Sequence, residues 1–208
     1  MSSEQIRETY LEAGKFFGGV VDQVDIDGFE APALGEWCVR DLIGHTYRSF
    51  TTVLSYSAIP GDTGDTIELE RPVDYFLKAF ESLADPNQVA ERGRAAGLEI
   101  IDDPKMMVRG FAMYVKNKLD ELSDDHIMAT PVGGMRLIDY LPTRTFELII
   151  HTMDLAIALG VNDEPPENGL EATLQILGQL ALYRGHAPRL ILATTGRHVL
   201  PEGFSLLG

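Results

Sequence analysis

Cysteine and basic residues are both scarce in this 208-residue chain. The single cysteine, Cys38, excludes an internal disulfide and suits the reducing conditions of the cytoplasm. Seventeen basic residues stand against 32 acidic ones, which gives a formal charge of −15 and a pI near 4.6. Such a surface repels phosphate groups, so we expect neither nucleic acid nor an anionic membrane as a partner.

Long apolar runs and targeting signals are also absent. No run approaches the roughly 18 residues of a membrane span, and the first five residues have neither the basic nor the apolar region of a signal peptide. Apolar residues make up 45% of the chain, which is ample for a core, and no repeat or low-complexity tract divides it. We therefore expect one soluble, cytoplasmic domain over residues 1–208.

Alternating strand patterns are nearly missing, whereas apolar residues recur at helical spacing along most of the chain. The first helix should be capped by Ser2 or Ser3. Helices are predicted over about 4–24, 39–57, 72–83, 87–98, 104–122, 144–160 and 170–183. We expect a loop at 25–35, a long exposed crossover at 60–70, an irregular or short extended pair at 124–134, and a helix or strand at 190–197. Together they predict an all-α four-helix bundle with a long crossover and a short C-terminal helix or tail.

The helix predicted over 144–160 carries a line of ionisable residues. It is apolar nearly all round and ends at Gly160, so it should lie in a core, with Pro142 tolerable only in its first turn. Steps of three, four and three place four ionisable residues on one face: Arg144, Glu147, His151 and Asp154. Because unpaired buried charge is costly, the line indicates an ion-pair network, a metal ion, or both.

A second polar line lies on the helix predicted over 39–57. Its members are Asp41, His45, Arg48 and Thr52. In a bundle, His45 would face Glu147 and His151, which are one turn apart. The three would form a two-histidine, one-carboxylate metal site with a coordination position open for water or substrate. A structural, hydrogen-bonded Glu–His pair is the alternative that this spacing leaves open.

The charged residues around this site each have two interpretations. Asp41 and Asp154 would either orient the imidazoles as hydrogen-bond acceptors or pair with arginines. Arg48 or Arg144 would hold an anionic substrate, although for Arg144 a salt bridge inside the bundle is the favoured interpretation.

Cys38 and the other histidines are weaker candidates. Cys38 precedes His45 by about two helical turns, roughly 10 Å, which is too far for both to bind one ion. A helix N-terminus that lowers the pKa of Cys38 would leave it a minor redox or thiol-exchange role. His126, His186 and His198 fall in loops or at helix ends and are interpreted as surface residues.

Two separated motifs resemble those of a known family. They are Trp37–His45 (WCVRDLIGH) and, about a hundred residues further on, Arg144–Gly160 (RTFELIIHTMDLAIALG). The combination resembles the mycothiol-dependent maleylpyruvate isomerase family of the DinB-like superfamily. The closing Thr195–Arg197 and Leu200–Phe204 are similar to the tail of many members.

The resemblance implies a four-helix bundle and a divalent metal, usually zinc, with nickel, iron or manganese as alternatives. The family's ligands are one histidine of the second long helix and a Glu-x3-His pair of the last, which match His45, Glu147 and His151. The resemblance further implies mycothiol or a similar thiol as cosubstrate. The metal would bind its thiolate, which attacks a small electrophile.

Two departures shape the functional hypothesis. Cys38 stands where the family commonly has a Ser or Thr cap, so this cap should be weaker. The isomerase has a further C-terminal domain, which we do not expect within these 208 residues. This expectation favours a thiol S-transferase or another thiol-dependent reaction on a small molecule. The rival hypothesis is a non-catalytic metal- or ligand-binding bundle, in which an exposed helix face could pair two copies as a homodimer.

Overall fold

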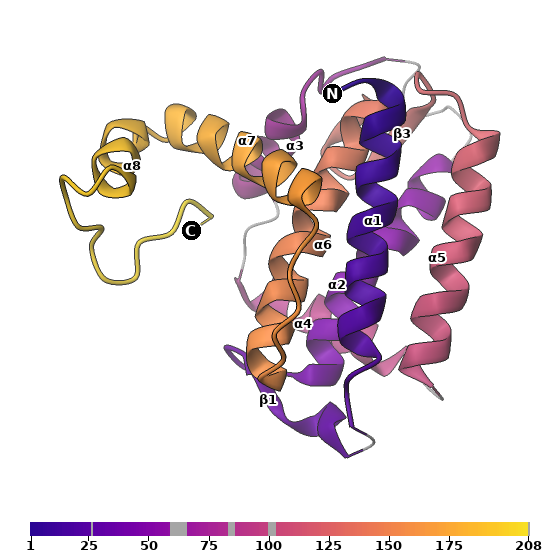
Figure 1. The fold of residues 1–208 in the computed structure, drawn as a ribbon. Helices are drawn as coiled ribbons and strands as arrows, with labels where there is room; N and C mark the ends of the chain where they lie inside the picture. The colour runs from indigo at the N-terminus through magenta and orange to yellow at the C-terminus, as the bar shows by residue number, and fades with distance from the viewer. Residues whose placement is uncertain (26, 59–65, 83–85, 100–102, 208) are drawn as a thin grey trace.

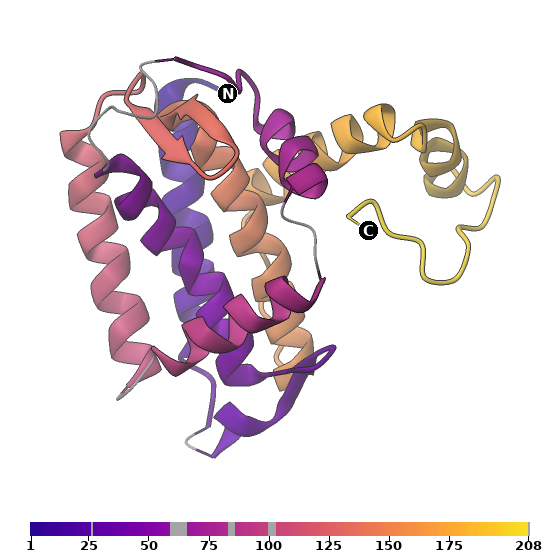
Figure 2. The ribbon, with the colours of Figure 1, turned by 180° about the vertical axis from the view of Figure 1, so that it is seen from behind.

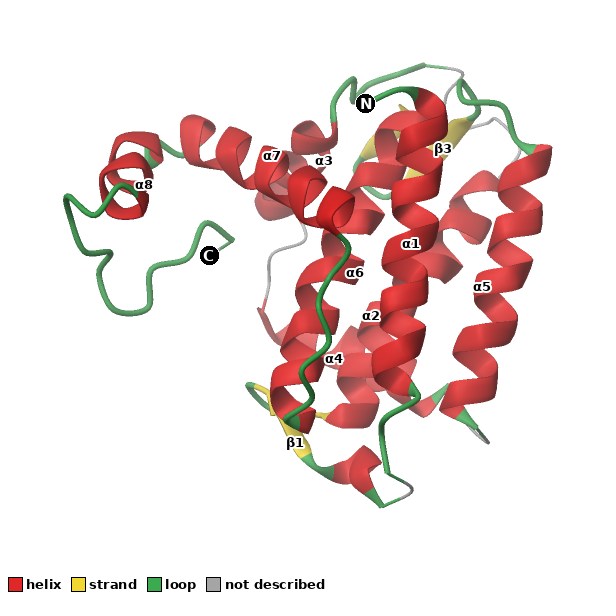
Figure 3. Ribbon diagram, viewed as in Figure 1, coloured by secondary structure: helices red, strands yellow, loops and turns green. Residues whose placement is uncertain are grey.

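The computed structural model consists mainly of helices, which confirms the all-α class (Figures 1 and 3). It describes residues 1–25, 27–58, 66–82, 86–99 and 103–207, with the backbone alone for 86–90. The four longest helices of the body are α1 (Ser3–Val21), α2 (Val39–Ser57), α5 (Pro104–Glu121) and α6 (Leu137–Leu159). The shorter helices are α3 (Pro72–Ser82), α4 (Pro86–Leu98), α7 (Glu167–Tyr183) and α8 (Ala187–Thr194).

Two small antiparallel sheets and a 3-10 turn complete the described elements. The turn spans Gly28–Glu30, and the first sheet pairs β1 (Pro32–Leu34) with β2 (Trp37–Cys38). The second pairs β3 (Ile127–Thr130) with β4 (Gly133–Arg136), which confirms the extended pair predicted near 124–134. The predicted loop at 25–35 therefore contains a turn of helix and a short strand.

The four long helices surround a shared core. Helix α1 contacts α5 and α6, and α2 contacts the same two helices. Helices α2 and α5 run in the same direction, so the chain between them has to cross the body (Figure 1). That crossover contains α3, which lies against α6 and α7, and α4, which packs across α2 (Figure 2).

Large apolar side chains fill the space between these helices. Tyr10 and Phe17 of α1, Phe50 of α2 and Leu148 of α6 are each at most 1% exposed. The edge of the Tyr10 ring meets Phe50, with ring centroids 6.2 Å apart, and the Tyr10 hydroxyl donates to the Ser49 carbonyl at 3.0 Å. Burial of each such side chain contributes roughly 1.5–3 kcal/mol, which holds the helices in register.

Local signals set the helix ends. The Ser2 hydroxyl accepts a hydrogen bond from the Gln5 N–H, and the Gln5 side chain accepts one from the Ser2 N–H. The capping role of Ser2 is therefore confirmed. Asp103 caps α5, whose first residue is Pro104. Gly160 ends α6 in the left-handed region, at φ 66°.

A close approach of α2 and α4 depends on glycine. A Cβ on Gly44 would lie 2.3 Å from the backbone nitrogen of Gly97, and one on Gly97 would lie 2.9 Å from Asp41 Oδ1. Neither position has room for a larger residue unless the helices separate. The contact fixes α4 over the part of α2 that carries His45.

The prediction for the start of α6 was wrong. The helix begins at Leu137, so Pro142 is its sixth residue and lies in the second turn, where a missing N–H and ring crowding cost about 3 kcal/mol. Leu137, Tyr140 and Leu141 are completely buried, so packing of this first segment against the core offsets the cost.

The connection at 60–70 was predicted to be exposed, and the described residues 66–68 and 70 are. Its residues 60–65 lie outside the described residues. Leu69 is only 3% exposed, and the N–H groups of Glu68 and Leu69 donate to the Gly134 carbonyl at 2.8 and 3.1 Å. The end of the crossover is therefore attached to the hairpin of β3 and β4.

Helices α7 and α8 and the C-terminal tail extend away from the four long helices (Figure 1). A second, smaller core joins α7 to α3 and α6 through Val73, Phe76, Phe146, Ile176 and Leu180. The segment near 190–197 was predicted as a helix or a strand, and its first half belongs to helix α8. None of the helices among the described residues has both the length and the apolar character needed to cross a membrane.

Candidate metal centre

Helices α2 and α6 bring His45, Glu147 and His151 together. Glu147 Oε2 lies 3.2 Å from His151 Nε2 and 3.9 Å from His45 Nε2. One ligand atom from each residue can be chosen so that all three lie within 4.8 Å of one another, and the group could hold a metal ion. The two imidazole rings meet edge to face, with centroids 4.7 Å apart.

The separations and the donor types fit a divalent ion. Nitrogen and oxygen ligands about 2.0–2.1 Å from a tetrahedral zinc lie about 3.3 Å apart, close to the 3.2 Å found for Glu147 and His151. The 3.9 Å between Glu147 Oε2 and His45 Nε2 is longer than this spacing, so His45 would have to move closer to bind the same ion. The side chains of the three residues are 17–23% exposed, so an ion and a small molecule could reach them from solvent.

His151 lies between two carboxylates. Its Nε2 faces Glu147, and its Nδ1 is 3.2 Å from Asp154 Oδ2. Burial alone would lower the pKa of His151, but hydrogen bonds to Asp154 and Glu147 raise it to about 9. Burial would raise the pKa of Glu147, but His151, and then the charge of Arg144, lower it to about 2. Asp154 is therefore placed to orient the imidazole of His151.

His45 has a different environment. Its ring stacks on Trp37, with centroids 4.6 Å apart, and burial is the largest cause that lowers its pKa to about 3. His45 Nδ1 is buried and has no hydrogen-bond partner among the described residues. Asp41 has a partner that neither predicted alternative, orienting His45 or pairing with an arginine, included. Its Oδ2 accepts from the Cys38 N–H at 3.2 Å, because a carboxylate at the third helical position is within reach of the cap N–H.

Arg144 does not form the salt bridge that the sequence favoured. The described residues offer no carboxylate within 4.0 Å of its nitrogens. Its guanidinium carbon instead lies 5.0 Å from the ring centre of Tyr75 and 4.9 Å from that of Tyr140, and its Nε donates to Thr143 Oγ1 at 3.0 Å. Tyr75 and Tyr140 were missed, because from the sequence they are indistinguishable from core residues.

Cys38 and the remaining histidines lie away from the centre. Burial is the main cause of a raised pKa of the Cys38 thiol, so the lowered pKa suggested for it is wrong. His126 Nε2 is 3.1 Å from the Ser57 carbonyl, the His186 ring packs on Phe204, and His198 is exposed. These histidines have structural or surface positions.

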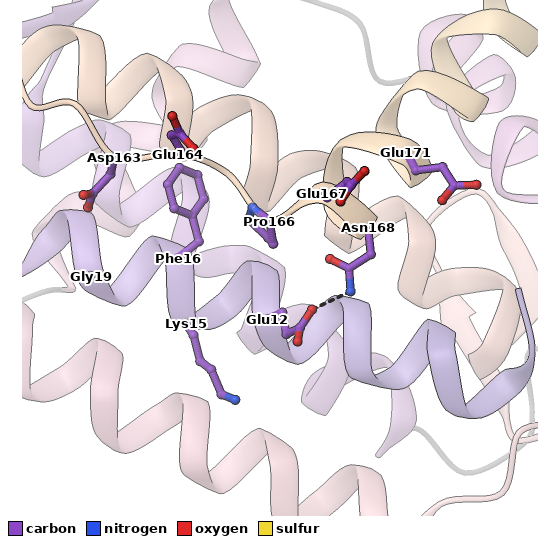
Figure 4. Close-up of a pocket in the computed structure, with 10 residues that line it drawn as sticks. All are labelled: Glu12, Lys15, Phe16, Gly19, Asp163, Glu164, Pro166, Glu167, Asn168 and Glu171. Atoms are coloured by element: carbon purple, nitrogen blue, oxygen red, sulfur yellow. Dashed lines mark hydrogen bonds between the residues drawn. The ribbon is translucent and has the colours of Figure 1, made fainter.

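An open groove of about 830 Å³ lies elsewhere, between α1 and residues 163–171 (Figure 4). Its charged lining consists of five carboxylates and one lysine: Glu12, Asp163, Glu164, Glu167, Glu171 and Lys15. Asn168 donates to Glu12 across it. Most of these side chains point to solvent, which is typical of a hydrated surface groove.

A scan against models of known protein families found no match to this chain, and searches of the curated proteins and of the solved structures found none either. The resemblance described above thus depends on the motifs of α2 and α6 and on the tail.

Proposed function

We propose that the chain is a divalent-metal-dependent enzyme of the DinB-like type, which uses a low-molecular-weight thiol such as mycothiol to attack a small electrophile. An ion held by His45, Glu147 and His151 would lower the pKa of a thiol or water that it binds, so that a nucleophile is available at neutral pH. The ring of α1, α6, α2 and α5 supports the bundle part of this proposal.

The observation that carries the proposal is the position of His45. A purely structural network would need only Glu147, His151 and Asp154, because these three residues already pair with one another. His45 adds no hydrogen bond to them: its Nε2 is 3.9 Å from Glu147 and its buried Nδ1 is unpartnered. A buried polar group without a partner costs about 1–3 kcal/mol, a cost that is explained if His45 is there to bind an ion.

The residues of the site have separate tasks in this proposal. Asp154 accepts a hydrogen bond from the Nδ1–H of His151, which leaves Nε2 as the electron-pair donor toward the ion. Trp37 covers one face of His45 and keeps water from that side. Zinc is the favoured ion, because two imidazoles and a carboxylate leave a tetrahedral position open, whereas nickel, iron and manganese accept the same donors.

Metal content and metal binding test the proposal. Elemental mass spectrometry of the purified protein should show close to one equivalent of a divalent metal, either as isolated or after addition of zinc. The H45A variant should bind zinc at least about tenfold more weakly. The H198A variant, which removes an exposed histidine, should bind as the wild type does. Binding of less than about 0.1 equivalent of zinc or nickel would contradict the metal centre, and full binding by H45A would contradict the ligand assignment.

Thiol consumption distinguishes an enzyme from the rival metal- or ligand-binding bundle. The assay combines mycothiol, or a cysteine-based surrogate, with a panel of small electrophiles, and compares metal-free with zinc-loaded protein. Turnover that requires the metal supports the enzyme. Stoichiometric metal binding without turnover favours the rival.

A further inference from the structure

Two arginines lie one helical turn from the metal centre, one on each of the two helices that form it. The Tyr140 hydroxyl donates to Thr52 Oγ1 at 2.9 Å, and further along the same helices Glu147 faces His45, so α2 and α6 are antiparallel in this region. Arg48 follows His45 by one turn, and Arg144 precedes Glu147 by one turn. Both arginines therefore lie between these two contacts.

In the described part of the chain, no carboxylate lies within 4.0 Å of either arginine, although the charge of Glu147, one turn away on α6, acts on Arg144 at longer range. Arg144 is the most buried charged side chain there, at 7% exposed, and its only hydrogen bond is the one from Nε to Thr143. The two Nη atoms of Arg144 donate no hydrogen bond to a described residue. They are not fully buried, so solvent or a ligand can reach them. Arg48 is half-buried and its guanidinium makes no ion pair with a described carboxylate.

Two arginines at matching positions of α2 and α6, neither of them in an ion pair with a described carboxylate, are suited to bind an anion. Their charges act on the same groups, since both lower the pKa of His45 and of Tyr56. The rings of Tyr75 and Tyr140 compensate part of the desolvation of Arg144 through cation–π contacts. A divalent ion on Glu147 would add positive charge, which increases the need for an anion.

We infer that Arg48 and Arg144 bind the carboxylate of a small organic acid beside the His45–Glu147–His151 group. The two free Nη atoms of a guanidinium match the two oxygens of a carboxylate. The inference deepens the proposed function and depends on it for the position of the reacting group: the acid is held at the arginines and its electrophilic atom faces the metal ligands.

A structural role for Arg144 predicts the opposite stability effect from a binding role. If Arg144 serves only to bind an anion, the R144M variant removes an unpaired buried charge and keeps the apolar packing on the tyrosines. Its melting temperature in buffer without small anions should then equal or exceed that of the wild type. A melting temperature lowered by more than about 5 °C, with acetate affinity unchanged, would overturn the inference.

Calorimetric titration with acetate and with inorganic phosphate completes the test, on metal-free and zinc-loaded protein. Acetate should bind the wild type more tightly than phosphate, and more tightly with zinc present. R144M should lose at least about tenfold in acetate affinity, which equals about 1.4 kcal/mol. R48M, which changes a half-buried residue and so keeps the fold, should lose affinity in the same direction. R189M, at an exposed arginine of α8, should lose none.

The outcomes separate the two proposals. Acetate binding that R144M and R48M abolish, in a protein that binds no zinc, would support the carboxylate subsite and refute the metal centre. Zinc binding with equal acetate affinity in wild type, R144M and R48M would refute the subsite alone. Tighter binding of phosphate than of acetate would overturn the assignment of the ligand as a carboxylate.

Discussion

Zinc binding to this protein should release one proton, and that proton should come from His151. In the metal-free protein, hydrogen bonds to Asp154 and Glu147 raise the pKa of His151 to about 9. The pKa of His45 is lowered to about 3 and that of Glu147 to about 2, so neither carries a proton near neutral pH. Only His151 must lose a proton to become a ligand. The apparent affinity should therefore rise tenfold, or about 1.4 kcal/mol, for each unit of pH.

Competition with a chromophoric chelator measures this slope. Titrations at about pH 5.5, 6 and 6.5 suffice, and they stay below about pH 7, where water on a zinc ion begins to ionise. Calorimetry in two buffers of different protonation enthalpy counts the released proton independently. In the D154N variant a neutral amide replaces one of the two carboxylates beside His151, so the pKa of His151 should fall. Proton release near pH 7 should then be less than in the wild type.

Two results would refute this account of the charges. A slope near two would mean that His45 is also protonated in the metal-free protein, which contradicts the effect of its burial. A slope near zero would mean that His151 is neutral there, so its hydrogen bonds to Glu147 and Asp154 would not be charge-assisted.

Three further predictions concern stability, measured by denaturant unfolding of the metal-free protein. G44A should lose about 1–3 kcal/mol, because its Cβ would meet the backbone of Gly97 at 2.3 Å, whereas G110A, at a helical glycine with open space around it, should be neutral or gain up to about 1 kcal/mol. Equal effects would contradict the helix contact. L148A should lose about 2–5 kcal/mol, since Leu148 is completely buried, and a loss below about 1 kcal/mol would refute its place in the core. Because the pKa of His151 is raised in the folded state to about 9 from a usual 6.5, its contribution to stability is complete below about pH 6.5 and is lost as the pH rises through 9. The loss should be about 3 kcal/mol, and constant stability over that range would contradict the ion pair.

The helical parts of the site follow from local sequence. A spacing of four residues on a helix fixes the proximity of Glu147 and His151, and the 3.2 Å contact between them follows from it. The bounds of α2 and the end of α6 at Gly160 also depend on neighbouring residues, which is why they were predictable. The approach of His45 required the packing of two helices a hundred residues apart, and only the expectation of a bundle suggested it.

Competition between partners explains the errors. Asp41 has the helical spacing to reach His45, but the nearer cap N–H of Cys38 binds its carboxylate. The two tyrosines around Arg144 come from α3 and from the preceding turn of α6, and nothing in their local sequence distinguishes them from core residues. Pro142 indicated a helix start, but the burial of Leu137–Leu141 outweighs the loss of one hydrogen bond.

The elements packed against α6 give different properties to the four charged residues on one of its faces. Asp154 and Glu147 lie on either side of His151 and keep it charged when no ion is present. Arg144 belongs to the same line but packs against tyrosine rings, and in our proposal its charge binds the ligand. Because α2 adds His45 opposite Glu147 and Arg48 opposite Arg144, one helix pair contains a group suited to a cation next to a group suited to an anion. Such an arrangement favours a ligand whose negative group and reactive atom are close together.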